Sequence, residues 1–158
     1  MKILYINSAR KMLQNKEELE KKLKVKIIVK GQSTTISGNQ VDEFFAERVL
    51  QALDFPFSLD EALLLLNEDY VFEVLSIKDY TKRKNLSIIK GRIIGTKGKT
   101  LKVLQDLSNA FIAVKENNVA IIAHSDNFKD SMQAVISIIH GSKQGNVYAH
   151  LEKARKRQ

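Results

Sequence analysis

The chain has 158 residues, a length that suits one ordinary domain or two small ones. Its 44% hydrophobic and 28% charged residues are typical of a globular protein, and its formal net charge is +8. The longest apolar runs, 63–66 and 119–123, are far shorter than the roughly 20 residues that cross a bilayer, and the first residues do not resemble a signal peptide. We therefore expect an intracellular, cytoplasmic protein with no membrane association.

The composition also argues against most enzyme chemistry. The chain has no cysteine, which excludes disulfides, thiolate nucleophiles and thiolate metal sites. Its three histidines, His124, His140 and His150, lack metal-ligand spacing, and no set of nucleophile, base and orienting group is recognisable. We therefore expect no catalytic residue, no metal, no cofactor and no small-molecule substrate.

The first half begins with a strand at 1–6 and a helix at 8–23 that is broken near Asn15. Asn15 and Glu18 have the spacing of a capping box, which predicts a helix start at Asn15. Strands at 25–29 and 34–37 follow, joined by a turn. The next segment predicts an amphipathic helix in which Arg48 points away from the core and four apolar residues point toward it: Val41, Phe44, Phe45 and Val49.

A connecting segment, 55–69, contains the only proline of the chain, Pro56. Ser58 and Glu61 form a second capping box ahead of a leucine-rich run at 59–66. We expect a packed helical linker here rather than a flexible tether.

The second half predicts the same order of elements. A strand at 71–78 precedes two short helices, 85–94 and 99–107, and a hairpin joins strands 111–115 and 119–124. Asp126 or Asn127 caps a last helix that Gly141 ends. One face of that helix carries Phe128, Met132, Val135, Ile136 and Ile139. Both halves thus read β-α-α-β-β-α, an internal repeat of element order.

The positive charge lies in the second half. Residues 1–78 hold 11 Lys and Arg against 12 Asp and Glu, a net of −1, whereas residues 79–158 hold 15 against 6, a net of +9. Such asymmetry favours binding to a polyanion, because neutralising phosphates releases their counterions.

The loop Gly95-Thr96-Lys97-Gly98 separates the two short helices. Two glycines let another backbone approach without a Cβ in the way, and the helix that starts after Gly98 directs free N–H groups at the loop. Lys97, Lys99 and Lys102 add positive charge, while Ile93 and Ile94 would supply part of an apolar floor for bases. A strand and helix before this loop, and a helix, hairpin and capped helix after it, are the arrangement of a KH module, which clamps about four nucleotides of single-stranded nucleic acid.

Three stretches resemble a narrower family, the archaeal two-KH proteins related to eukaryotic small-subunit ribosome assembly factors. They are Lys90–Thr100, Val119–Ile122, and Gly145–Tyr148 followed by Leu151-Glu152. The resemblance implies an α+β fold of two tandem type I KH units, each a three-stranded sheet packed on helices. It implies a divergent unit at 1–54, a linker at 55–69, a second unit at 70–152 and a basic tail at 153–158.

The resemblance further implies binding near the 3′ end of small-subunit ribosomal RNA, within the pre-ribosomal small subunit, alongside a PIN-domain endonuclease that does the cutting. The residues expected to bind RNA are Lys82, Arg83, Lys84, Lys90, Arg92, Ile93, Ile94, Gly95, Thr96, Lys97, Gly98, Lys99 and Lys102.

One position and one segment depart from the family pattern. Gln144 stands where the family resemblance leads us to expect a histidine. The first unit has Gln14-Asn15-Lys16-Glu17 in place of the glycine loop, so we expect it to serve as a structural partner or a protein-binding surface.

The sequence is open to two other interpretations. Gly98-Lys99-Thr100 matches the end of a Walker A motif, but Ile93 occupies the position of its first glycine and a helix, not a strand, precedes the loop. The alternative that stays open keeps the KH fold in an adaptor or regulator that binds other RNA, with the first unit as a protein-interaction surface.

Overall fold

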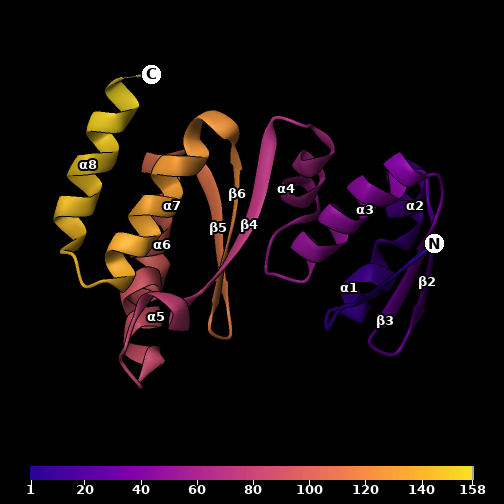
Figure 1. Cartoon of the computed structure of the whole chain (residues 1–158), viewed down its shortest axis with the longest axis horizontal. Coiled ribbons are helices and arrows are strands. Elements are labelled where there is room, and N and C mark those ends of the chain that lie inside the picture. Colours follow the sequence, from indigo (N-terminus) through magenta and orange to yellow (C-terminus); the bar gives the residue numbers. More distant parts are fainter. Residues whose placement is uncertain (158) are drawn as a thin grey trace. The chain divides into compact units, whose positions relative to one another are not determined.

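The computed structural model describes residues 1–157, and in it the chain folds into two units, Met1–Glu68 and Asp69 onward (Figure 1). Each unit contains one three-stranded antiparallel sheet. No helix among residues 1–157 has the length and apolar character needed to cross a membrane.

The first unit is an α+β fold whose elements are β1 (Lys2–Tyr5), α1 (Ala9–Gln14), α2 (Lys16–Leu23), β2 (Lys26–Lys30), β3 (Ser33–Ser37), α3 (Gln40–Leu53) and α4 (Leu59–Leu63), followed by a 3₁₀ turn at Leu64–Leu66. The sheet order is β1-β3-β2. Alternation along the strands buries Leu4, Ile27 and Ile36 on one face. Ile3 and Ile28 pair with Thr35 from either side and are exposed on the opposite face.

Two details of the first unit correct the expectations. Asn15 separates α1 from α2, but its side chain makes no cap; its Nδ2 donates instead to the carbonyl of Lys11 at 2.9 Å. On α3, Val49 is buried as expected, whereas Val41 is 64% and Phe44 53% exposed. The buried stripe includes Glu43, Ala46, Val49, Leu50 and Leu53. It is therefore rotated around the helix, and the guanidinium of Arg48 lies 5.9 Å from the Phe44 ring centroid on the open side.

The connecting segment packs within the first unit. Ser58 and Glu61 form the expected capping box, with the Glu61 amide 3.1 Å from the Ser58 hydroxyl and the Ser58 amide 3.0 Å from the Glu61 carboxylate. Lys11 Nζ donates to the carbonyl of Phe55 at 2.9 Å, and Arg48 Nη1 donates to that of Leu65 at 3.3 Å. These bonds hold the segment against α1 and α3.

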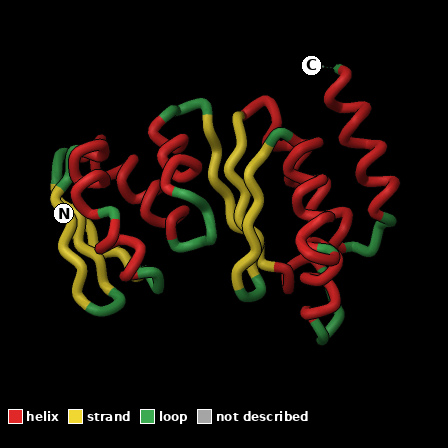
Figure 2. Tube along the Cα trace, turned by 180° about the vertical axis from the view of Figure 1, so that it is seen from behind, coloured by secondary structure: helices red, strands yellow, loops and turns green. Residues whose placement is uncertain are grey.

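The second unit contains β4 (Tyr70–Ser76), the 3₁₀ helix η2 (Ile77–Tyr80), α5 (Leu86–Ile94), the 3₁₀ turn η3 (Thr96–Gly98), α6 (Lys99–Ser108), β5 (Ala110–Lys115), β6 (Asn118–His124), α7 (Ser125–Ile139) and α8 (Gln144–Lys156) (Figure 2). The sheet order is β4-β6-β5. Helices α5, α6 and α7 pack together over the sheet, and α8 packs on α6 and α7. The core between them includes Ile89, Leu104, Ile121, Val135 and Ile138.

Helix α7 begins earlier than the sequence predicted. Its N-cap is His124, whose Nδ1 accepts a hydrogen bond from the Asp126 amide at 3.1 Å, so neither Asp126 nor Asn127 is the cap. The helix ends at Ile139, and Gly141 adopts a φ of +102° just beyond it, as a helix-ending glycine does.

Helix α8 was not predicted as a separate element. Val147 and Leu151, four residues apart, bury themselves in the core, and Tyr148 packs beside them. The expected basic tail at 153–158 is helical through Lys156, and Gln158 lies outside the described residues.

Candidate nucleic-acid interface

The glycine loop joins α5 to α6 through a chain of unusual backbone conformations. Gly95 has φ 74° and ψ 176°, a region that is essentially restricted to glycine. Lys97 and Gly98 follow with φ values of 55° and 74°, both left-handed. The Gly95 amide donates to the Gly91 carbonyl at 2.7 Å and the Gly98 amide to the Gly95 carbonyl at 3.2 Å. The loop is therefore a fixed turn rather than a loose connection.

The two glycines serve different purposes. A Cβ on Gly95 would lie 2.8 Å from the Thr100 amide nitrogen and would collide with the Thr100 side chain. A Cβ on Gly98 would meet nothing within 4 Å. Gly95 is thus needed for packing inside the unit, while the space over Gly98 is open to an incoming strand.

A second group of bonds holds the loop from behind, at the corner between α7 and α8. Arg92 donates from Nη1 to the Ile138 carbonyl at 2.9 Å and from Nη2 to the Ser142 carbonyl at 2.6 Å. Gln144 Nε2 donates to the Arg92 carbonyl at 3.0 Å and lies 3.3 Å from Thr100 Oγ1. Gln144 therefore bridges the last turn of α5 and the first turn of α6.

The expected RNA-binding residues differ in exposure. Seven are exposed: Lys82, Arg83, Lys84, Thr96, Lys97, Lys99 and Lys102. Five are half-buried: Lys90, Arg92, Ile94, Gly95 and Gly98. Ile93 is completely buried in the core, so it supports the loop from below and cannot offer a surface to a base. Both terminal nitrogens of Arg92 donate to backbone carbonyls, so this side chain stabilises the end of α5 beside the loop.

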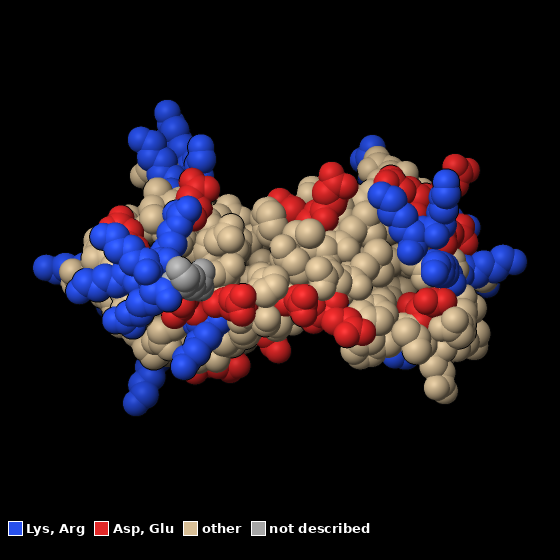
Figure 3. Space-filling model, turned by 90° about the horizontal axis from the view of Figure 1, so that it is seen from above, with Lys and Arg blue, Asp and Glu red and all other residues tan. Residues whose placement is uncertain are grey.

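The exposed cations form two groups. Lys97, Lys99 and Lys102 lie on the loop and the first turn of α6, where the helix directs free amides and the positive end of its dipole outward. Lys82, Arg83 and Lys84 precede the opposite end of α5, which at nine residues is about 13 Å long. A third basic group, on the last turns of α8, gathers at one end of the second unit (Figure 3).

The corresponding position of the first unit has no such glycine loop. Met12 is completely buried, like Ile93, but a single residue, Asn15, separates α1 from α2. Glu17 and Glu18 occupy the first turn of α2, where they would repel a phosphate. Among residues 1–157, no group of three or more His, Asp or Glu side chains is arranged to hold a metal ion.

Comparison with known proteins extends this picture. Residues 71–156 match the family model of a eukaryotic type KH domain, KH-domain type I, as found in the second such domain of Pno1. A KH domain-containing protein of Methanocaldococcus jannaschii is 30% identical over 149 residues, which cover 90% of this chain and 66% of that protein. The pre-rRNA-processing protein pno1 of Schizosaccharomyces pombe is 33% identical over 111 residues, 68% of this chain and 46% of that protein.

Two solved structures agree along almost the whole chain. Dim2p from Pyrococcus horikoshii superposes with a TM-score of 0.86 at 28% identity, covering 96% of this chain and 98% of that one. The same organism's aDim2p, solved in a complex with a/eIF2alpha and rRNA, gives a TM-score of 0.88 at 27% identity, covering 99% and 94%. The chain spans about half to two thirds of the length of the curated relatives above. It belongs to the family of type I KH proteins that includes Pno1 and the archaeal Dim2 proteins.

Proposed function

We propose that this chain binds single-stranded RNA through the glycine loop of its second unit and acts as a non-catalytic factor in maturation of small-subunit ribosomal RNA. The observation that carries the proposal is the loop itself: open space over Gly98, exposed Lys97 and Lys99, and the start of α6 beside them. Together they can hold the phosphates of about four nucleotides.

The biological setting of the proposal comes from the relatives. The fungal relatives carry the name pre-rRNA-processing protein, and a structural neighbour was solved with rRNA and a/eIF2alpha. By extension, the RNA target is the 3′ end of small-subunit ribosomal RNA in the pre-ribosomal small subunit, and a PIN-domain endonuclease is the partner that cuts it. A cytoplasmic location accompanies this role.

The proposal also assigns the parts of the chain. Residues 70–152 act as the RNA-binding KH unit and 1–54 as a divergent tandem KH unit without a clamp, joined by 55–69. The element order β-α-α-β-β-α in both units supports this division. The exposed cations of the loop, together with Lys82, Arg83 and Lys84, are the proposed RNA contacts, and 153–158 adds a nonspecific electrostatic contribution.

Fluorescence anisotropy tests the proposal with a labelled RNA that matches the 3′ end of small-subunit ribosomal RNA and a scrambled RNA of equal length. The loop variant replaces Thr96 and Lys97 by aspartate, and its matched control replaces Asn15 and Lys16 by aspartate at the equivalent position of the first unit. Both double substitutions change the formal charge by the same amount, so a general loss of positive charge affects them equally.

We expect tight binding that prefers the ribosomal sequence, that survives in the Asn15 and Lys16 variant, and that falls at least about a hundredfold in the loop variant. Equal losses in both variants would contradict a localised clamp. Equal affinity for the two RNAs would still support RNA binding by the loop but would contradict ribosomal RNA as its specific target.

One observation favours a second candidate, an adaptor that joins another RNA to a protein. The outer face of the first sheet exposes Ile3 at 55%, Tyr5 at 83% and Ile28 at 50%. An apolar sheet face of this kind is common at protein interfaces. Strong binding to unrelated RNAs, with no preference for the ribosomal sequence, would favour this candidate.

A further inference from the structure

The corner between α7 and α8 reaches the surface directly beside the glycine loop. Arg92, in the last turn of α5, holds the carbonyls of Ile138 and Ser142, and the Ser142 amide donates to the Ser137 carbonyl at 2.9 Å. The His140 amide donates to Ile136 at 2.9 Å. The backbone that carries His140 is therefore fixed with respect to α5, which ends at Ile94.

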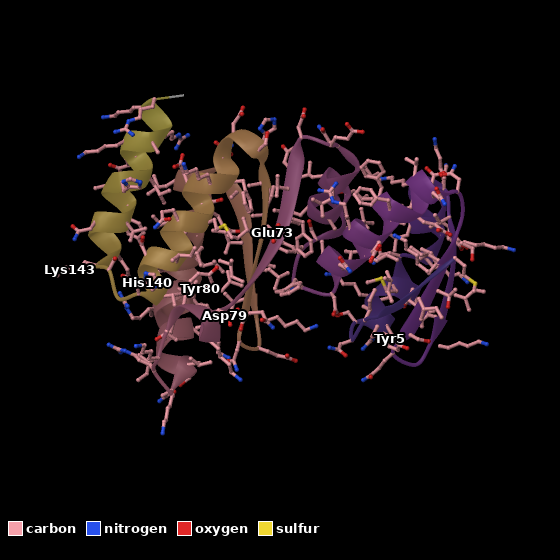
Figure 4. The ribbon with its side chains drawn as sticks, viewed as in Figure 1. Tyr5, Glu73, Asp79, Tyr80, His140 and Lys143 are labelled. Atoms are coloured by element: carbon pink, nitrogen blue, oxygen red, sulfur yellow. The ribbon has the colours of Figure 1, made fainter. Side chains whose placement is uncertain are left out.

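An aromatic pair lies on this corner. The ring of His140 is 6.3 Å from that of Tyr80, with an angle of 51° between the planes. Tyr80 is half-buried and packs on the core of the unit, whereas His140 is exposed. In Figure 4 the two side chains lie next to each other, with Asp79 beside Tyr80 and Lys143 at the start of α8. Tyr80 thus supports an imidazole whose surface is open to solvent.

Positive charges lie close in the chain to both members of the pair. Lys143 follows His140 by three residues, and Lys82, Arg83 and Lys84 follow Tyr80 after a single threonine; all four are exposed. Asp79 places one negative charge nearby, and these cations outnumber it. Unpaired bases stack on aromatic side chains, histidine included, while neighbouring cations hold their phosphates.

We propose that His140, supported by Tyr80 and flanked by Lys143 and the 82–84 run, is a second nucleotide site that stacks one base of the RNA strand outside the four-nucleotide clamp. This inference rests on the proposed function, because the strand that reaches His140 is the one that the glycine loop holds. In this arrangement Lys82, Arg83 and Lys84 contact the RNA backbone beside the stacked base. They precede the start of α5, a helix about 13 Å long that separates them from the glycine loop.

The experiment couples a side chain to a single base. A labelled 12-nucleotide RNA from the 3′ end of small-subunit ribosomal RNA is prepared intact and as a series in which one position at a time lacks its base. Binding is measured for the unaltered protein, His140→Ala, His140→Phe and His150→Ala. His150 is an exposed histidine on α8 and serves as the control.

His140→Ala is expected to lower affinity for the intact RNA about tenfold, the loss typical of one stacked base. At one position, base removal is expected to cost the unaltered protein about tenfold and to cost His140→Ala nothing further. His140→Phe keeps a stacking surface and should bind like the unaltered protein, as should His150→Ala.

Two results would overturn the inference. If base removal and His140→Ala add independently at every position while the Thr96 and Lys97 double-aspartate variant still abolishes binding, no second site exists and the proposed function stands. If the double-aspartate variant binds as well as the unaltered protein, the clamp itself is wrong and the second site falls with it.

Discussion

Gly95 packs so closely against Thr100 that no residue with a side chain fits at position 95. An added Cβ would approach the Thr100 amide to 2.8 Å, and the φ of 74° at Gly95 already disfavours a side chain. Gly95 is therefore required for packing within the unit, whereas Gly98 leaves open space over the loop.

The two glycines should respond differently to alanine. Gly95→Ala is expected to destabilise the protein by about 3 kcal/mol or more, because the clash is with backbone and a branched side chain. Gly98→Ala should cost only about 1 kcal/mol, since its Cβ enters open space and only the left-handed backbone is unfavourable. Urea unfolding measures both, and equal costs would show that Thr100 can move aside.

Gln144 should act on RNA binding without touching RNA. Gln144→Ala removes the bridge between the Arg92 carbonyl and Thr100, so we expect RNA affinity to fall about threefold to tenfold with a small loss of stability. Because no charge is lost, the dependence of affinity on salt should keep its slope, whereas Lys97→Ala should reduce that slope by about one. A changed slope in Gln144→Ala would indicate that loss of the bridge also displaces the charged side chains of the loop from the RNA.

The orientation of α3 predicts that substitutions on its exposed and buried faces have unequal effects on stability. Phe44→Ala should cost about 1 kcal/mol or less, because the ring is 53% exposed and contacts Phe45 and Arg48 at the surface. Leu50→Ala should cost about 2 to 5 kcal/mol, since Leu50 is completely buried. Thermal unfolding of the two variants compares them directly, and a larger loss for Phe44 would restore the arrangement that the sequence suggested.

Glu43 should make stability depend on acidity. The N-terminal ammonium, 2.6 Å from its Oε1, lowers the pKa of this carboxyl, and the Gly38 amide helps at 3.2 Å. A lowered pKa means that the folded state prefers the charged form, so the stabilisation is present above the unfolded pKa near 4.5 and is lost as pH falls through the lower folded pKa.

The difference in melting temperature between the unaltered protein and Glu43→Gln is thus expected to be largest near neutral pH and to shrink below about pH 4. Melting curves from pH 7 to pH 3 provide the measurement. A constant difference across that range would mean that the charge on Glu43 contributes nothing.

The sequence predicted the three strands of the second unit and helices α5 and α6 to within one or two residues, because each carried its own local signal. A continuous apolar run marked β6, and two glycines marked the turn between α5 and α6. The glycine loop could be predicted for the same reason: its conformation depends on residues adjacent in the chain.

The hydrogen bonds of Gln144 and Arg92 behind the loop left no local signal in the sequence. Gln144 and Arg92 are 52 positions apart, and a single side chain bonded to a distant carbonyl produces no periodicity. Val147, Leu151 and Ala154 do have helical spacing, so α8 could have been found from it. The prediction of the buried face of α3 was wrong because Val41 and Phe44 continue the apolar pattern onto a face that is exposed.

The bridge from Gln144 to the Arg92 carbonyl and Thr100, on either side of the glycine loop, also sets an order of events during synthesis. The ribosome makes residues 86–108 first, so both helices of the clamp and all four loop residues exist before the α7–α8 corner has been translated. Until Gln144 emerges, the Arg92 carbonyl and Thr100 lack this bridge. A nascent chain halted within α7 would therefore carry all four residues of the glycine loop and still lack the bridge between the helices on either side of it.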